Sequence, residues 1–409
     1  MLSDITIIES SAFVAAPLAG LICAQMGATV IRIDPPRGAL DADRWPVSDD
    51  GISLRWAGLN KGKQSMALDL SRPEGRDILH ALLAGSGRGG GIFLTNFRAS
   101  GPLSYTALQA VRDDVIQAVI KGNRDGSSEV DYTVNPALGF AMATGFGDRP
   151  VNHVLPAWDI ATGLWMVSAI TAAVRERERT GQGRLIELAL SDAALAITSH
   201  LGFYAEAALK QQPMGNVGND LYGAFGTDFL TRDGRRIMLA AITIHQWKAM
   251  VKALEIAPAI AQIELRLGLD FDREGDRYLG RGEIAALVAP WMAARSYAEA
   301  TETLDRHGCS WGPYRSFRET LADDPRCSLN NPIFESVKHP RTAAYLTAGL
   351  PYDMTPGERR FPGEAPIPGQ HTAEILGSRL KLSQTAIDRL FDSGVVGGPP
   401  GVRCLKGVA

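Results

Sequence analysis

Asp159 is the residue whose type and setting could most directly do chemistry in this sequence. It lies between the turn-like segment "VLPAW" and the apolar segment "IATGLWMVSAITAAV", in a stretch that is poor in charge. A carboxylate can act as a nucleophile, and the covalent intermediate divides one difficult group transfer into easier steps. Aspartate is also a preferred helix N-cap, accepting an amide hydrogen near Ala161 or Thr162. The local pattern leaves both roles open.

The setting of Asp159 also bears on its charge and its access. At the start of a helix, the helix dipole favours the anion, so we expect Asp159 to stay ionised. Gly163 follows one turn later and would let a bulky substrate come close. Both features suit a nucleophile.

Two further segments place polar groups after expected strands. "IKGNRDG" brings Lys121, Gly122 and Arg124 to the end of one strand, and "TNFR" brings Asn96 to the end of another. Ligands of open α/β sheets bind at the carboxyl ends of the strands, and paired cations with glycine suit a phosphate. A solvated polar turn is the alternative interpretation of the first segment.

Other familiar sites find little support. The segment "SSAFVAAPLAG" precedes a helix and Asp34 ends the next strand, but the fingerprint G-x-G-x-x-G of dinucleotide-binding enzymes is missing. The histidines lack metal-binding spacing, and the scattered cysteines form no C-x-x-C pair. We expect no metal site, no disulfide framework and no dehydrogenase.

Composition excludes some partners. The chain has 409 residues, 45% hydrophobic and 21% charged, with a formal charge of −3 and no basic run, so we expect no nucleic-acid partner. The N-terminus "MLSDITIIES" does not look like a signal peptide. The apolar stretch "GLWMVSAITAAV" is shorter than the ~20 residues of a membrane span. These features predict a soluble, cytoplasmic protein without a membrane partner.

The elements that must position Asp159 alternate between strands and helices. Short β-branched runs predict strands at 5–10, 29–34, 91–97 and 114–122, and apolar spacing predicts helices at 16–27, 73–85 and 159–183, the last stopped by Gly181. Such alternation is typical of an α/β fold: a Rossmann-like parallel sheet with helices on both faces.

The pattern of predicted elements changes beyond about residue 210. Two β-like runs, "GTDFLT" and "RRIMLAAIT", flank the turn "RDG", and helical segments follow. We therefore predict a large Rossmann-like domain over 1–214, a smaller α+β domain over 215–320, and over 321–409 an extended, proline-rich tail that ends in a helix and returns to the large domain.

Taken together, the chain resembles the family III coenzyme A (CoA) transferases along nearly its whole length. No single motif decides this, but their order and number make the match specific. The resembling stretches are "FVAAPLAGLICAQMGATVIRIDPPRG", "LNKGKQSMALDLSRPEG", "LTNFR", "PAWDIATGLWMVSAITAAVRERERTGQGRLIELALSDAAL", "YGAFGTDFLTRDGRRIMLA" and "HQW".

The resemblance implies roles for particular residues. Asp159 would be the nucleophile, carrying the reaction through a mixed anhydride and an aspartyl-CoA thioester, with CoA as part of the substrate and no metal or prosthetic group. Recognition of CoA would fall on Val14, Ala15, Leu68, Asp69, Asn96, Phe97, Lys121 and Gly122. Arg37 and Arg124 are added from their charge and position. An interlocked homodimer with a small-molecule acyl-CoA substrate is also implied.

Within the family, "RWPV", "SEVDYTVNP" and "VNHVLPAWD" are similar to members that move CoA between the two carboxyl groups of one dicarboxylic acid. The free carboxylate of that acid would need a polar partner, and Arg44, Tyr132, Asn135 or His153 could supply it. Two alternatives remain at this point. One is an intermolecular CoA transferase with a separate carboxylic acid as acceptor, and the other is a non-catalytic nucleotide-binding protein in which Asp159 only caps a helix.

Overall fold

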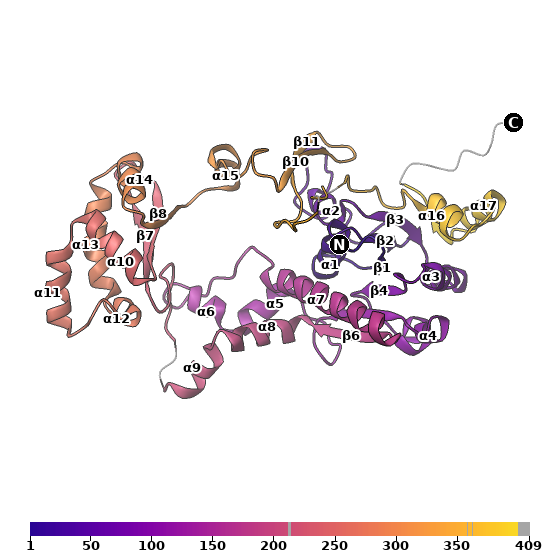
Figure 1. The fold of residues 1–409 in the computed structure, drawn as a ribbon, viewed down its shortest axis with the longest axis horizontal. Helices are drawn as coiled ribbons and strands as arrows, with labels where there is room; N and C mark the ends of the chain where they lie inside the picture. Colours follow the sequence, from indigo (N-terminus) through magenta and orange to yellow (C-terminus); the bar gives the residue numbers. More distant parts are fainter. Residues whose placement is uncertain (212–213, 358, 362, 400–409) are drawn as a thin grey trace. The chain divides into compact units, whose positions relative to one another are not determined.

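The computed structural model describes residues 1–211, 214–357, 359–361 and 363–399, and its chain divides into two compact units (Figure 1). Unit 1 comprises residues 1–138, 153–209 and 325–409, and unit 2 comprises residues 139–152 and 210–324. Residues 139–152 therefore group with unit 2, although we predicted them in the large domain. The segment after 324 belongs to unit 1.

Unit 1 is built on a seven-stranded sheet in the order β12-β3-β2-β1-β4-β5-β6. All neighbouring strands are parallel except β12, which pairs antiparallel with β3. The strands are β1 (Thr6–Ser10), β2 (Thr29–Asp34), β3 (Gln64–Leu68), β4 (Ile92–Thr95), β5 (Ile116–Lys121), β6 (Arg184–Ala189) and β12 (Val396–Gly397). The order reverses direction between β1 and β4, as in a Rossmann fold.

Helices cover both faces of this sheet, which confirms the predicted fold class. Ile7 faces one apolar core with α1 and α7, whereas the next residue, Ile8, faces a second core with α3, α16 and α17. The helices of unit 1 are α1 (Ala15–Gln25), α2 (Leu54–Asn60), α3 (Pro73–Gly85), α4 (Tyr105–Val111), α5 (Asp131–Ala137), α7 (Ala157–Thr180), α8 (Leu190–His200), α9 (Phe203–Leu209), α16 (Thr372–Arg379) and α17 (Gln384–Asp392), with a short turn η1 (Gly101–Leu103) and a hairpin of β10 (Phe334–Lys338) and β11 (Ala344–Ala348).

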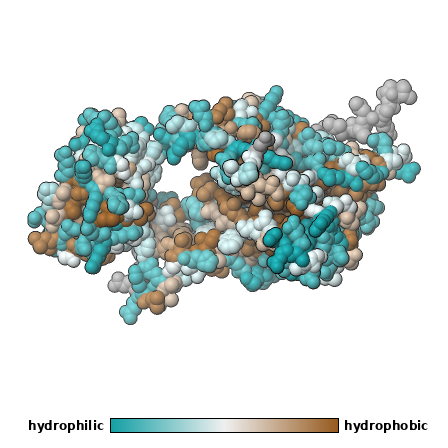
Figure 2. All heavy atoms as spheres, viewed as in Figure 1, coloured by the Kyte–Doolittle hydropathy of each residue, from teal (hydrophilic) through white to brown (hydrophobic). Residues whose placement is uncertain are grey.

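Helix α7 is the longest element, and its composition follows from its packing. It ends where Gly181 adopts φ 73°, so the predicted stop is confirmed. By length and composition it is the one helix among the described residues that could cross a membrane. Met166, Ile170 and Val174 are buried against the sheet, however, which explains much of its apolar character. Figure 2 shows hydrophobic residues gathered over its first half and hydrophilic ones over its end.

Unit 2 contains a three-stranded antiparallel sheet in the order β7-β8-β9. The two predicted β-runs form β7 and β8, because the turn between them lets the strands pair antiparallel. Helices surround a separate apolar core that includes Phe225, Trp247 and Phe271. The elements are α6 (Phe140–Thr144), β7 (Phe225–Leu230), β8 (Arg236–Ala241), α10 (Ile244–Leu254), α11 (Ala257–Leu267), α12 (Glu274–Leu279), α13 (Arg281–Ala293), α14 (Tyr297–Arg306), β9 (Ser310–Pro313) and α15 (Phe317–Asp323).

Candidate active site

The carboxyl ends of β1 and β4 lie at the point where the strand order reverses, and the loops that follow them are joined. The amide of Ala12 donates to Oδ1 of Asn96 at 2.9 Å, and Nδ2 of Asn96 donates to the carbonyl of Ala12 at 2.8 Å. Asn96 therefore fixes the loop after β1 through two reciprocal hydrogen bonds. The Asn96 side chain therefore stabilises this loop, whether or not it also contacts a ligand.

The loop after β1 has an unusual backbone. Phe13 adopts φ 74°, a region that L-residues rarely occupy, and its amide donates to Oδ2 of Asp41 at 2.9 Å. Val14 is the N-cap of α1 and Ala15 its first residue, and both side chains are buried. The predicted CoA-binding loop is thus a tightly held turn that leaves the ring of Phe13 exposed.

A buried network of charged side chains holds the turn after β1 through hydrogen bonds to its backbone. Nζ of Lys63 pairs with Oε2 of Glu9 at 2.9 Å, and both side chains are fully buried. The guanidinium of Arg32, also fully buried, pairs with Asp34 at 3.0 Å and with Asp41 at 2.6 Å. Arg32 and Lys63 further donate to the Asn60 side chain and to the carbonyls of Ser11 and Pro17, respectively. Every cation in the network is therefore neutralised.

Sequence reasoning missed this network. The signal was present, because Glu9 and Arg32 lie inside otherwise apolar strand runs, where an unpaired charge would be costly to bury. Both residues were treated as parts of strands and not as a charged set. The network positions the turn around Phe13 and Val14 and is the main structural support of the site.

Asp159 does not cap its helix. Helix α7 begins at Ala157, its N-cap is Pro156, and no side chain of that residue caps it. Instead Oδ2 of Asp131, on α5, accepts the amides of Trp158 at 2.7 Å and Asp159 at 3.1 Å. The predicted start of the helix at 159 was therefore two residues late. The carboxylate of Asp159 forms no hydrogen bond or ion pair within the described part of the chain.

The surroundings of Asp159 raise its pKa from 3.8 to about 6. Burial contributes most, the charge of Asp131 adds to it, and Arg55 and Arg44 act in the opposite direction. We expected the helix dipole to keep this carboxyl fully ionised, but desolvation and a second carboxylate outweigh that effect. An ionisable group poised near neutrality is typical of a functional site.

Gly163 brings α7 against the start of α1. A Cβ atom at this position would lie 2.8 Å from the carbonyl oxygen of Ala15 and 3.2 Å from Cδ2 of Leu18. The small residue thus lets two helices meet closely, and it places Asp159, one turn earlier, near the turn after β1. The predicted need for glycine is explained by helix packing.

We expect Gly163→Ala to destabilise the protein by about 1–3 kcal/mol, because the backbone of α1 must move to admit the methyl group. Gly85→Ala is the matched control, since nothing lies within 4 Å of a Cβ atom at that position on α3. The measurement is the free energy of unfolding by denaturant titration. Equal stabilities of the two variants would contradict the packing argument.

The predicted cations after β5 have partners within the chain. Lys121 forms an ion pair with Glu187 of β6, and Arg124, which is 85% exposed, pairs with Asp192 at 2.7 Å. A Cβ atom on Gly122 would lie 2.4 Å from the amide nitrogen of Glu129, so this glycine permits a close turn. The turn is satisfied internally, as in the alternative interpretation, and a ligand would have to compete with these carboxylates.

The remaining predicted CoA contacts are spread along the same edge of the sheet. Leu68 ends β3 and its side chain is buried in an apolar core, so only its backbone could meet a ligand. Asp69 accepts hydrogen bonds from the amide and hydroxyl of Ser71, which lower its pKa, and Arg37 nearby is exposed. Phe97 is 38% exposed and available for stacking.

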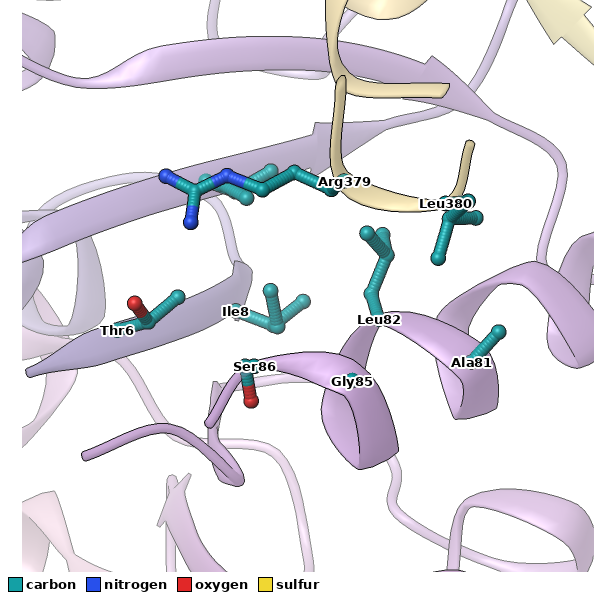
Figure 3. Close-up of a pocket in the computed structure, with 9 residues that line it drawn as sticks. Thr6, Ile8, Ala81, Leu82, Gly85, Ser86, Arg379 and Leu380 are labelled. Atoms are coloured by element: carbon teal, nitrogen blue, oxygen red, sulfur yellow. The ribbon is translucent and has the colours of Figure 1, made fainter. Parts of the chain in front are cut away.

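No metal site is indicated among the described residues. They contain no cluster of three or more potential metal ligands. Cys23, Cys309 and Cys327 are unpaired, and Cys404 lies outside the described residues. Figure 3 shows a small pocket lined by Ile8, Leu82 and Leu380, which admits about one water molecule and includes none of the predicted site residues.

The sequence profile of "CoA-transferase family III" matches residues 2–372. The chain belongs to this family. It is 48% identical over 402 residues to the 2-methylfumaryl-CoA isomerase of Chloroflexus aurantiacus, and the match covers 98% of both chains. The predicted family is thereby confirmed, and the chain is an enzyme of the CoA-transferase type.

More distant relatives are named as CoA transferases between two different acids. The succinyl-CoA:mesaconate CoA-transferase of Haloarcula hispanica is 25% identical, with 92% of this chain and 95% of the relative covered. Among solved structures, a CaiB/BaiF family protein from Brucella suis matches with a TM-score of 0.73 at 22% identity, covering 91% of this chain and 98% of that one. This likeness supports the fold described above.

Proposed function

We propose that this enzyme moves CoA within one molecule of 2-methylfumaryl-CoA, also called mesaconyl-CoA, from the carbon 1 carboxyl to the carbon 4 carboxyl. The product is 3-methylfumaryl-CoA. The observation that carries the proposal is the carboxylate of Asp159. This carboxylate has no hydrogen-bond or ion-pair partner within the described chain, and its pKa is raised to about 6. The chain that carries it is 48% identical to a 2-methylfumaryl-CoA isomerase.

The proposed reaction uses Asp159 twice. Its carboxylate attacks the thioester carbonyl, forming an anhydride with mesaconate and expelling CoA thiolate. The thiolate attacks the aspartyl carbonyl, which gives an aspartyl-CoA thioester and frees mesaconate. Mesaconate then turns, its other carboxylate attacks the aspartyl thioester, and the released thiolate takes the acyl group from the new anhydride. Atoms balance without a metal or prosthetic group.

CoA itself would lie along the carboxyl edge of the sheet. Phe97 and Arg37 are exposed there, and the turn around Val14 and Ala15 presents backbone beside Asp159. These features support the predicted recognition residues, with Asn96 acting through the turn that it holds. Lys121 and Arg124 would serve only if the phosphates of CoA displaced Glu187 and Asp192, a competition that charge-assisted hydrogen bonds can win.

Purified protein incubated with mesaconyl-CoA alone tests the activity. We expect chromatography to show the carbon 1 thioester converted to the carbon 4 thioester with no other acid present. If conversion requires an added carboxylic acid, the enzyme is an intermolecular transferase, the alternative that the 25% identical Haloarcula relative favours. No conversion under either condition would withdraw the proposed substrate.

The pH dependence of the reaction follows from the raised pKa of Asp159. Only the carboxylate can attack, so kcat/KM should rise with pH through a midpoint near 6. In Asp131→Asn the amide oxygen can still accept the helix amides, but the negative charge that raises the pKa of Asp159 is gone. We therefore expect the midpoint to move to lower pH.

The control for this profile is Asp388→Asn, an exposed carboxylate on α17, whose midpoint should equal that of the wild type. An Asp131→Asn profile that is lower in rate at every pH but unchanged in midpoint would assign Asp131 a structural role only. A shift to higher pH would contradict the charge argument.

We further propose that the enzyme works in the cytoplasm as an interlocked homodimer. The first half of α7 leaves Leu164 and Trp165 about half exposed, and Leu201 after α8 is 65% exposed. Such apolar residues on neighbouring elements suit burial against a second copy. Light scattering of the purified protein tests this proposal, and we expect it to give the mass of two chains.

A further inference from the structure

Arg44 and Arg55, whose charges act on Asp159, belong to one segment that is held by hydrogen bonds to its backbone. Ser53 caps α2 by accepting the amide of Trp56, and its hydroxyl donates to the carbonyl of Arg44 at 2.5 Å. Nε of Arg55, in the first turn of α2, donates to the carbonyl of Trp45 at 2.7 Å. The two side chains thus start from one compact segment, and Arg55 keeps its terminal nitrogens available.

This segment faces the turn that carries the site. The guanidinium of Arg44 lies over the ring of Phe13, 5.0 Å from its centroid. Phe13 directly precedes the start of α1, and α1 meets α7 at Gly163, one turn after Asp159. Arg44 therefore contacts the residue just before the N-cap of α1, the helix that packs against α7 one turn after Asp159.

The charges of the two arginines act on Asp159 but are not neutralised. Both lower the pKa of Asp159, against the effects of burial and of Asp131. Within the part of the chain that the structure describes, neither forms an ion pair with a carboxylate. Arg32, by contrast, is paired with two aspartates. A pair of free guanidinium groups beside a reactive carboxylate is suited to bind a second carboxylate.

We propose that Arg44 and Arg55 form the subsite for the carboxylate of mesaconate that is not attached to CoA or to Asp159. This inference rests on the proposed function. Mesaconate becomes a free dianion when the aspartyl-CoA thioester forms, and two cations would keep it in the site until its other carboxylate attacks. Retention makes the second half of the reaction intramolecular, which gives a held reactant a large effective concentration.

The test compares Arg44→Gln and Arg55→Gln with Arg175→Gln, an exposed arginine far along α7 from Asp159. Assays are run at pH 8, where Asp159 stays ionised despite the lost cations. With mesaconyl-CoA and labelled free mesaconate, the wild type and Arg175→Gln should give product with little label. Each site variant should raise KM by about tenfold or more and admit label into the product.

A second substrate separates this role from a structural one. Crotonyl-CoA carries a methyl group where mesaconyl-CoA carries its free carboxylate, so acylation of Asp159 by it should not need the two arginines. We expect equal rates of aspartyl-CoA formation from crotonyl-CoA, followed by mass spectrometry of the intact protein, in all variants. The subsite would be overturned if the two variants lost activity equally with both thioesters. It would also be overturned if Arg44→Gln and Arg55→Gln formed product without label. Failure of the wild type to isomerise mesaconyl-CoA would instead reject the proposed function.

Discussion

Asp159→Asn is expected to lower the rate of CoA transfer by at least about a thousandfold, because an amide cannot form the anhydride on which every later step depends. The fold should be unaffected. The carboxylate of Asp159 holds nothing in the described chain, and the amides at the start of α7 are bound by Asp131. The measurement is the initial rate of carbon 4 thioester formation, with circular dichroism and thermal unfolding as checks of structure.

Glu374→Gln provides the control, since Glu374 also lies in the first turn of a helix, α16, and is exposed. Its rate should stay within about twofold of the wild type, because substitutions at exposed positions away from the site have small effects. Substantial turnover by Asp159→Asn, with no aspartyl-CoA adduct in the wild type, would mean that another group is the nucleophile.

Lys63→Met is expected to produce the largest loss of stability, about 3–5 kcal/mol, because it leaves the buried carboxylate of Glu9 without its cation. Both side chains are fully buried, and Glu9 also lies so close to α1 that a Cβ atom on Gly20 would overlap its Oε2. The pair therefore has no room to admit solvent in compensation. Urea titration measures the change in the free energy of unfolding.

The double variant Glu9→Leu with Lys63→Met should recover much of this loss, since removing both charges also removes their desolvation cost. Glu176→Gln, which breaks the exposed pair with Arg184, should change stability by less than about 1 kcal/mol. If Lys63→Met were as mild as Glu176→Gln, the buried pair would not be a major support of the turn at Phe13.

Four strands of the sheet could be predicted because each is a short run of mainly apolar residues. The segments around β1, β2, β4 and β5 carried that signal, whereas β6 did not. Arg184 and Glu187 interrupt β6, and all but the last of its six residues stay at least partly accessible at the edge of the sheet. The single helix predicted for the tail is two helices, α16 and α17, separated near Leu380.

The position of Asp159 at the start of a long helix could be predicted from its neighbours, but its freedom from capping could not. That freedom depends on Asp131, which is 28 residues earlier and meets α7 only in the folded chain. The proposed pairing of Arg44 with Arg55 also depends on the fold, because Ser53 and Arg55 donate hydrogen bonds to the carbonyls of Arg44 and Trp45. Local sequence patterns do not encode contacts that form only in the folded chain. The position of the nucleophile could therefore be predicted, but the charges around it could not.

The most direct test of the central claim is to supply mesaconyl-CoA, with the thioester at carbon 1, together with excess isotope-labelled free mesaconate. Mass-resolved chromatography then follows the label. The account predicts carbon 4 thioester that carries no label, because mesaconate stays in the site between the two halves of the reaction. Label in the product at the level of the free pool would contradict it and would make the enzyme an intermolecular CoA transferase.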